Sequence, residues 1–378
     1  MAEALLSEPY DVVIVGAGPA GSSAARAASE NGARVLLIDR RQRIGVPVQC
    51  AELISQWISR YAAPSENCII QATQTMVTHL SDRTSPDRTY EMKSPGYMLD
   101  RPLFDKELVT SALSAGARIS IGTKAIGLSS RGLWAEKESK KIDIQSKVII
   151  GADGVHSLIA RWAGLPSVKS IVALQYEVGN IKAQVDAEVF LHPSYEGGYA
   201  WFFPKGRTAN VGLGVVPEKT ALLPSLLEQF LSHLIELKGI KNVAIVGQTG
   251  GSVPVEGPRQ TVWGHILLAG DAAGHAHPVT GAGILNAVVG GEIAGRIAAE
   301  AVRKGDIGYL QQYETEWREA FGDSLVYGAA KRRFLEENWN NAEIGFEALI
   351  RKSWVGFKEY YQDRKRSGTP CPEDTREP

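Results

Sequence analysis

The stretch that decides the fold is DVVIVGAGPAGSSAARAASENGARVLLID, residues 11–39. It opens with DVVIV, a short continuous apolar run that is typical of a buried strand in a parallel sheet. The alanine-rich residues 22–30 predict a helix, and the Asn-Gly pair at 31–32 is a typical helix end. RVLLID, residues 34–39, predicts a second strand. Together these segments predict a βαβ unit with a right-handed crossover.

The turn between the first strand and the helix has the pattern GxGxxG. Gly16 permits the tight turn, Gly18 lets a pyrophosphate approach the backbone, and Gly21 allows the helix to pack closely on the strand. Asp39, at the end of the second strand, stands where an acidic residue binds ribose hydroxyls. The pattern predicts a bound dinucleotide and leaves FAD and NAD open. The residues that we assign to the cofactor here are Gly16, Gly18, Pro19, Ala20, Gly21 and Asp39.

Two later segments favour FAD. The first is GADG at residues 151–154, which follows a predicted strand, and the second is Gly270-Asp271, which follows the apolar run HILLA. A carboxylate at a strand end can accept hydrogen bonds from a ribityl or ribose chain. A glycine-rich helix start comes next, and its N–H groups would lie near the pyrimidine edge of a flavin. We assign to the cofactor Asp153, Gly270, Asp271, Gly281, Gly283 and Ile284.

The composition is that of a folded globular protein. Hydrophobic residues make up 44% of the 378 residues and charged residues 22%, which argues against a disordered chain. The formal net charge is −1, so no basic excess indicates a nucleic-acid partner. Glycine is over-represented, with 39 residues, as expected where the backbone turns tightly or approaches a ligand.

The cysteines and the hydropathy pattern predict a cytoplasmic protein. Three cysteines do not make a disulfide framework, and no CxxC pair indicates a metal site. The N-terminus has no basic region before an apolar run, so we expect no signal peptide. No apolar run is long enough for a transmembrane helix.

The fold class that we expect is α/β, in which a Rossmann-like FAD-binding domain is interleaved with a mixed β-sheet substrate domain. A short helical C-terminal region, with a disordered tail, would follow. The basic run Lys331 to Arg333 is expected to be a solvated face of that region. The predicted boundaries are 1–70, 96–168 and 253–304 for the FAD domain, 71–95 and 169–252 for the substrate domain, 305–366 for the helices and 367–378 for the tail.

The segments GAGPAG, GADGVHSLIAR and GDAAGHAHPVTGAGI resemble the FAD-binding signatures of the aromatic-hydroxylase-like flavoproteins. Within that superfamily the chain most resembles the geranylgeranyl reductase family. PVQCAE at residues 47–52 and YAWFFPK at residues 199–205 carry this narrower likeness. The resemblance covers roughly residues 8–305. The chain has no WxWxIP segment of the halogenase type, which argues against halogenation.

This resemblance implies an enzyme in which reduced flavin delivers hydride to a carbon–carbon double bond of a prenyl chain. NAD(P)H or a separate reductase would supply the electrons. One alternative is a flavin monooxygenase that hydroxylates an aromatic compound or a protein side chain. Another is a flavin-binding partner protein without catalysis. The substrate is expected to be an apolar or aromatic small molecule, or a protein. Any association with a membrane is expected to be at most peripheral.

Five residues are candidates for catalysis. Cys50 could donate a proton or be redox-active beside the flavin, or be a small buried apolar residue. Tyr199 and Trp201 share one face of a predicted strand with Phe203, and the resemblance implies that they line the substrate cavity. His275 and His277 could donate a proton or merely shape a turn.

Three further residues are candidates for flavin contacts. Arg101 resembles an arginine that lies along the flavin in this superfamily, or it could pair with Asp105. Arg40 could touch the adenosine phosphates or be solvated. Pro278 resembles the family's proline beside the isoalloxazine ring.

Overall fold

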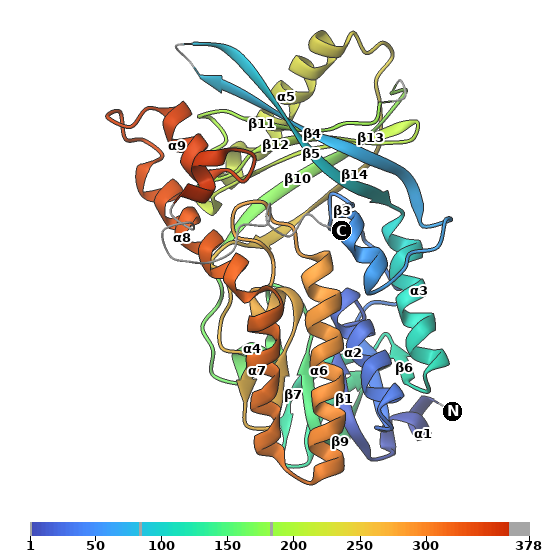
Figure 1. The fold of residues 1–378 in the computed structure, drawn as a ribbon. Coiled ribbons are helices and arrows are strands. Elements are labelled where there is room, and N and C mark those ends of the chain that lie inside the picture. Colours follow the sequence, from blue (N-terminus) through green and yellow to red (C-terminus); the bar gives the residue numbers. More distant parts are fainter. Residues whose placement is uncertain (1, 83–84, 182–183, 363–378) are drawn as a thin grey trace.

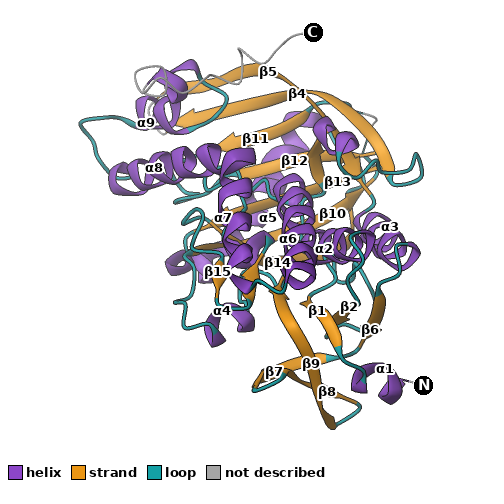
Figure 2. Cartoon of the chain, turned by 60° about the horizontal axis from the view of Figure 1, so that its bottom comes forward, coloured by secondary structure: helices purple, strands orange, loops and turns teal. Residues whose placement is uncertain are grey.

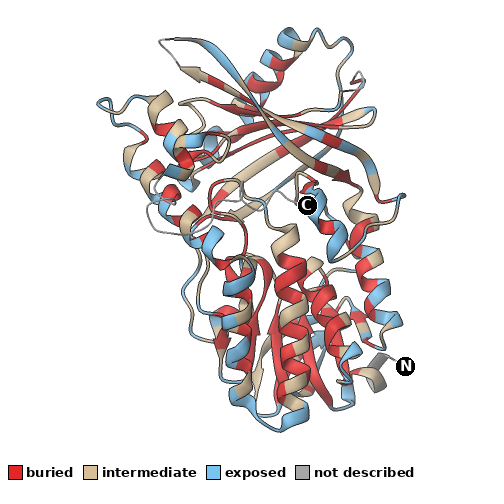
Figure 3. Cartoon of the chain, viewed as in Figure 1, coloured by how far each residue is buried: buried red, intermediate tan, exposed pale blue. Residues whose placement is uncertain are grey.

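The structure is a computed structural model that describes residues 2–82, 85–181 and 184–362 (Figure 1). Two β-sheets lie one above the other in the view of Figure 1, and the chain passes between them several times. Buried residues follow the strands of both sheets and the helices packed against the lower one (Figure 3). The predicted tail, residues 367–378, lies outside the described residues.

The first sheet grows from the predicted βαβ unit. Its strand order is β15-β16-β9-β1-β2-β6, and β1 pairs in parallel with both β2 and β9. Every residue of β1 is buried, as the unbroken apolar run predicted. Strands β7 and β8 extend β9 as an antiparallel ribbon at the bottom of the molecule (Figure 2). The bounds are β1 Tyr10–Val15, β2 Val35–Asp39, β6 Arg118–Ile121, β7 Lys124–Ser129, β8 Gly132–Lys137, β9 Lys140–Gly151, β15 Val262–Trp263 and β16 Ile266–Leu268.

Helices α2 and α6 run side by side over one face of this sheet (Figure 1). Their alanines and glycines leave room for the two backbones to come close, so the small-residue pattern in the sequence corresponds to a tight helix pair. The helix that follows the predicted glycine-rich start begins at Ile284, and Gly281 before it turns the chain with a positive φ of 69°. The helices around this sheet are α1 Ala2–Ser7, α2 Pro19–Glu30, α3 Arg101–Ser114, α4 Leu158–Trp162, α6 Ile284–Lys304 and α7 Gln311–Trp317.

The second sheet is mixed, with the order β14-β10-β13-β12-β11-β4-β5-β3, and only β11 and β4 pair in parallel. Helix α5 covers one of its faces through Leu227, Phe230 and Leu234. The bounds are β3 Leu53–Ser55, β4 Ile69–Asp82, β5 Ser85–Leu99, β10 Ser170–Gly179, β11 Ala187–Leu191, β12 Ala200–Lys205, β13 Thr208–Val215, β14 Ala244–Pro254 and α5 Leu223–Lys238.

The C-terminal helices pack against the other face of the second sheet (Figure 2). Leu335 and Trp354 contribute to that core, beside Trp201 of β12. The predicted solvated face is wrong for two residues of the basic run, since Lys331 is 7% and Arg332 3% exposed, whereas Arg333 is exposed. Arg332 pairs with Glu336 one turn further along α8, and its donation to the Gly197 carbonyl ties the helix to the segment before β12. The bounds are α8 Asp323–Asn338, α9 Phe346–Ser353, the short helices η1 Gln56–Arg60, η2 Pro217–Leu222, η3 Gly270–Ala273, η4 Ile307–Leu310 and η6 Lys358–Tyr361, and the π-helical turn η5 Arg318–Gly322.

Among the residues described, none of the helices combines the length and the apolar composition that crossing a bilayer requires.

Candidate active site

A cavity of about 1110 Å³ lies between the two sheets. The β1–α2 turn, the GADG segment and the residues around η3 line it on the side of the first sheet. Residues of β10, β12 and β14 line it on the side of the second sheet. Its far end is lined by residues of α8 and η6 and of the segment just after α9. The predicted cofactor turn and the predicted aromatic strand therefore face one continuous space.

The glycine turn has the geometry of a phosphate cradle. Gly16 has a φ of 104°, and a Cβ at this residue would lie 2.3 Å from the Ala152 oxygen, so only glycine fits there. Gly18 differs, because a Cβ there would meet no atom within 4 Å, and the residue faces the cavity at the N-terminus of α2. A helix N-terminus with open space in front of it suits a pyrophosphate.

Asp39 completes this cradle. Its Oδ2 accepts the Ala17 N–H at 2.8 Å and its Oδ1 accepts the Arg41 N–H at 2.7 Å. A carboxylate has about four acceptor positions, so Asp39 can still accept hydrogen bonds from ribose hydroxyls. The neighbouring Arg40 also lines the cavity.

The second predicted carboxylate, Asp153, lines the cavity while capping α4. It accepts the Ser157 hydroxyl at 2.5 Å and the Leu158 N–H at 2.7 Å. Burial nevertheless raises its pKa. Asp153 therefore fixes the GADG turn against the cofactor side of the cavity as well as presenting a carboxyl group to it.

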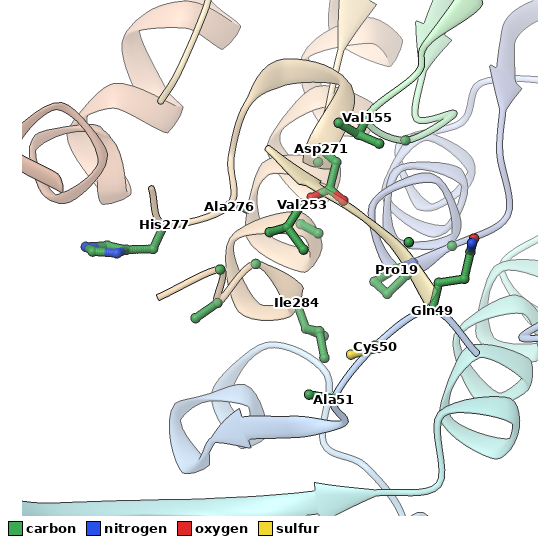
Figure 4. A pocket seen from close by; sticks show the side chains of 18 of the residues that line it. Pro19, Gln49, Cys50, Ala51, Val155, Val253, Asp271, Ala276, His277 and Ile284 are labelled. Atoms are coloured by element: carbon green, nitrogen blue, oxygen red, sulfur yellow. The ribbon is translucent and has the colours of Figure 1, made fainter. Parts of the chain in front are cut away.

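The third carboxylate, Asp271, points into the cavity between Pro19 and Val253 (Figure 4). Burial raises its pKa, and the positive charge of Arg101 opposes that shift. Arg101 makes two hydrogen bonds to Asp105, at 3.0 and 3.2 Å. Arg101 therefore makes the predicted pairing with Asp105 and also lines the cavity, while its contact with a flavin stays a prediction. The glycine-rich entry to α6 also lines the cavity, through Gly270, Gly281, Gly283 and Ile284.

This donor set fits FAD. The turn offers backbone N–H groups and open space for a pyrophosphate, and the carboxylates offer acceptors to ribose and ribityl hydroxyls. Within the described ranges, no group of three or more His, Cys, Asp or Glu residues is arranged to hold a metal ion.

The apolar half of the cavity is built on β12. Tyr199, at its start, stacks edge-on against Trp201 at 5.9 Å, and Trp201 stacks against Phe203 at 6.3 Å. Phe202 points the other way, into the core under α5, as the two-residue period of a strand predicted. Met76 and Met92, a cross-strand pair of β4 and β5, extend this apolar wall.

Hydrogen bonds hold the two polar aromatic side chains in place. The Tyr199 hydroxyl donates to the Thr280 carbonyl at 2.6 Å, and burial raises the pKa of Tyr199. The Trp201 Nε1 donates to the Gln175 Oε1 at 2.9 Å. Because both protons are engaged by protein acceptors, the two rings present apolar surface to a ligand.

Cys50 lies on the cavity wall opposite Asp271, next to Ile284 (Figure 4). Its Sγ accepts the Glu52 N–H at 3.2 Å, and the positive charge of Arg101 lies near the same sulfur. Cys50 is half-buried and so reaches the cavity without being sealed in the core.

The two predicted histidines lie in different places. His277 borders the cavity, but its ring points away from Asp271 and Cys50 (Figure 4), and burial lowers its pKa to about 4. His275 does not line the cavity. It is buried against Trp317 and Phe321, and burial lowers its pKa to about 3. Since its position gives it no contact with a ligand, we do not propose His275 as a proton donor.

We expect His275 to make the protein less stable in acid. The unfolded chain binds its proton near the ordinary pKa of 6.5 and the folded chain near 3, so the unfolded state holds more protons between these values. The contribution of His275 to the free energy of unfolding is therefore fully present above pH 6.5 and is lost as the pH falls towards 3. The loss is about 2 kcal/mol between pH 7 and pH 5. His275→Leu should remove that loss, as measured by urea unfolding at the two pH values. The same substitution at the exposed His265 should leave the pH dependence unchanged; an equal change in both variants would contradict the expectation.

Two predicted cofactor residues do not line the cavity. Gly21 lies behind the turn, where a Cβ would lie 1.8 Å from the Gly16 oxygen, in agreement with its expected packing role. Pro278 packs against Gly328 of α8, so we do not propose that it contacts the flavin ring.

Several cavity residues were not predicted from the sequence. Trp354 stacks edge-on against Tyr199 at 4.9 Å, and Tyr360 and Tyr361 line the same end. Their only signal was the scatter of aromatic residues in the C-terminal region, which does not say what those residues face. Gln175 was not singled out either, since a lone polar residue in an apolar strand has no characteristic pattern.

Two family models match adjoining parts of the chain. The model described as FAD dependent oxidoreductase matches residues 11–169, and the model described as geranylgeranyl reductase catalytic domain matches residues 170–253. The second match covers β10, β12 and β13, which carry the apolar wall of the cavity.

Relatives and solved structures match over most of the chain. A digeranylgeranylglycerophospholipid reductase of Methanothrix thermoacetophila is 38% identical, over 84% of this chain and 85% of its own length. One of Methanocaldococcus jannaschii is 37% identical, over 88% of each chain. A crystal structure described as geranylgeranyl bacteriochlorophyll reductase-like, from Thermoplasma acidophilum, has a TM-score of 0.79 at 28% identity and covers 95% of this chain and 99% of its own. A flavin-dependent brominase, at 17% identity and a TM-score of 0.71, covers 95% of this chain and 98% of its own, and shares the fold.

Proposed function

This chain belongs to the geranylgeranyl reductase family of FAD-dependent oxidoreductases, and from that membership we propose that it saturates the prenyl chains of a glycerophospholipid. The observation that carries the proposal is the single cavity that joins the FAD cradle to an apolar wall of Tyr199, Trp201 and Phe203. A hydrocarbon chain lying on that wall would reach the space in front of Ile284 and Cys50, beside the cofactor residues (Figure 4).

The protein's part in the reaction is to orient the chain and to supply a proton. Bound FAD supplies the hydride chemistry once it is reduced. Tyr199 and Trp201 hold the prenyl chain without donating to it, because their protons go to Thr280 and Gln175. The apolar wall also keeps water away from the double bond.

We propose Cys50 Sγ as the atom that gives up the proton. It lies on the cavity wall, whereas His277 points away and the Tyr199 proton is engaged. The thiolate that remains would be stabilised by the Glu52 N–H and by the Arg101 guanidinium.

Substituting Cys50 with serine is expected to lower kcat by about 100-fold with little change in KM, because a serine hydroxyl is a far weaker acid at the same position. The measurement is steady-state reduction of a digeranylgeranyl glycerophospholipid in detergent micelles. FAD absorbance and the thermal midpoint should match those of the wild type, and Cys371→Ser serves as the control. An unchanged kcat would remove Cys50 from the proposed role.

The proposed reaction is tested with the FAD-loaded protein, a reductant for the flavin (NAD(P)H or dithionite) and the same lipid, under argon and under air. Under argon, we expect the lipid to gain two hydrogens per double bond in successive steps. Mass spectrometry measures this gain. Oxygen-dependent gain of an oxygen atom would instead show a monooxygenase. Bound flavin that is reduced but changes no lipid would favour a partner protein without catalysis.

The electron source is part of the same proposal. Either NAD(P)H or a separate reductase would reduce the flavin, so the lipid assay is run in parallel with dithionite, NADPH and NADH. Turnover with dithionite alone would indicate a separate reductase. The cytoplasmic location stays a prediction.

A further inference from the structure

Glu52 combines a buried charge with an unusual backbone conformation. Only 3% of its surface is exposed, and its φ is +68°, in the left-handed region that residues other than glycine rarely adopt. A charged side chain in such a place is unfavourable unless its surroundings compensate it. Its contacts show what that compensation is.

The Glu52 carboxylate is held by groups from both halves of the molecule. Its Oε2 accepts the Lys205 Nζ at 2.6 Å and the Asn210 Nδ2 at 2.9 Å, from the ends of β12 and β13. Its Oε1 accepts the backbone N–H of Arg101 at 3.2 Å, at the start of α3. Lys205 is 13% exposed, so this ion pair is largely shielded from water.

The same contacts fix the two residues before Glu52. The Glu52 N–H donates to Cys50 Sγ at 3.2 Å, and the Asn210 Nδ2 also donates to the Ala51 carbonyl at 3.1 Å. The Cys50 carbonyl accepts the Gln175 Nε2 at 3.3 Å. The earlier part of the loop is held separately, for example by Gln49 on the Gly250 carbonyl.

We propose that Glu52 is a positioning residue, which ties Cys50 and Arg101 to the β12–β13 hairpin through Lys205 and Asn210. The hairpin that carries the aromatic wall thereby also sets where the thiol stands. This inference extends the proposed function, because it gives Glu52 a part in placing the proposed proton donor. Glu52 also lines the cavity, but protein groups engage both of its carboxylate oxygens, so in this assignment it acts through Cys50.

The test measures alkylation of Cys50 by iodoacetamide, followed by peptide mass spectrometry on the FAD-loaded full chain. The background is Cys371→Ser, so that Cys68 remains as an internal reference. Cys68 is fully buried, and burial raises its pKa to about 12, so it reacts only when the protein opens as a whole. The ratio of the two alkylation rates separates a local release of the loop from general loosening.

Lys205→Met should speed alkylation of Cys50 by about 10-fold and leave Cys68 unchanged, because the loop loses its charged anchor. Lys205→Arg keeps the charge and should stay within about 2-fold of the wild type. The matched control is Lys238→Met, which breaks another shielded ion pair, Lys238 with Glu188, on the face of the second sheet that α5 covers. It should leave the rate at Cys50 unchanged.

If Lys205→Met fails to fold, Glu52→Gln serves as a milder variant. It keeps the shape of the side chain and removes only its negative charge. The double variant Glu52→Gln, Lys205→Met should react no faster than the faster single variant, because both break one interaction. Unchanged alkylation of Cys50 in both single variants, or an equal rise at Cys50 and Cys68, would overturn the proposal.

The alkylation rate needs no turnover, so the two proposals fail separately. A wild type that reduces no prenyl lipid while Lys205→Met still releases Cys50 would overturn the function and keep the positioning role. If the wild type reduces the lipid and Cys50 of Lys205→Met is alkylated no faster than in the wild type, the function stands and the positioning role is overturned. In an active enzyme, Lys205→Met should lower kcat more than it changes KM.

Discussion

Gly295→Val is expected to cost the protein about 4 kcal/mol or more of stability. Gly295 lies where α6 crosses α2, and a Cβ there would lie 2.1 Å from the Ala24 oxygen and 2.9 Å from its Cα. The clash is with backbone, so no side-chain rotation can relieve it and the two helices must separate. The alanines of both helices would then lose the close contacts that form the core on this face of the sheet.

The measurement is the midpoint of urea unfolding of the apoprotein, together with the yield of soluble protein. The control is Glu292→Val on the same helix, which introduces the same β-branched side chain at a position that is 39% exposed. Glu292 makes an ion pair with Arg26 at 3.3 Å, and the loss of such a partly exposed pair should keep the change within about 1 kcal/mol. Equal midpoints for the two variants would show that α2 and α6 do not need the close approach.

Unlike Gly295→Val, Gly18→Leu should leave the protein stable but abolish tight binding of the cofactor. Gly18 has a φ of −84°, which any residue can adopt, and a Cβ there meets no atom within 4 Å. The added side chain would instead occupy the cavity where the pyrophosphate approaches the helix N-terminus. We expect the Kd for FAD to rise at least about 1000-fold, or about 4 kcal/mol, and the apoprotein to lose less than about 1 kcal/mol of stability.

Titration of the apoprotein with FAD, followed by flavin fluorescence, measures this effect. Gly127→Leu is the control, because its Cβ would meet only the Trp134 Cδ1, at 4.0 Å, and the residue does not line the cavity. That variant should bind FAD like the wild type. Tight binding by Gly18→Leu would mean that the cofactor does not approach the backbone at this turn.

The parts of the fold that the sequence predicted are those with a local signature. The apolar run of β1 and the glycines that follow it lie within a few residues of one another, so their pattern predicts both the strand–turn–helix unit and its ligand. The alternation of Tyr199, Trp201 and Phe203 against Phe202 is likewise a property of one strand. The family resemblance then indicated what those local units do.

The parts that were missed depend on contacts between distant residues. Glu52 and Lys205 meet across 153 residues of sequence, and nothing in either segment indicates the other. The basic run from Lys331 to Arg333 was predicted to be exposed because charged residues usually are, yet tertiary contacts bury Lys331 and Arg332. The place of His275 was missed for the same reason: two histidines close in sequence lie on different sides of one turn.

The cofactor cradle also bears on the order in which this protein matures. Its walls come from the β1–α2 turn, from the GADG segment near the middle of the chain, and from the residues just before α6. A chain emerging from the ribosome can complete the first of these early, and α3 can then pack against α2, but the helix that packs most extensively on α2, α6, is synthesised much later. We therefore expect flavin uptake to wait until most of the polypeptide has been made, so that a chain with bound flavin is one in which α6 has already packed against α2.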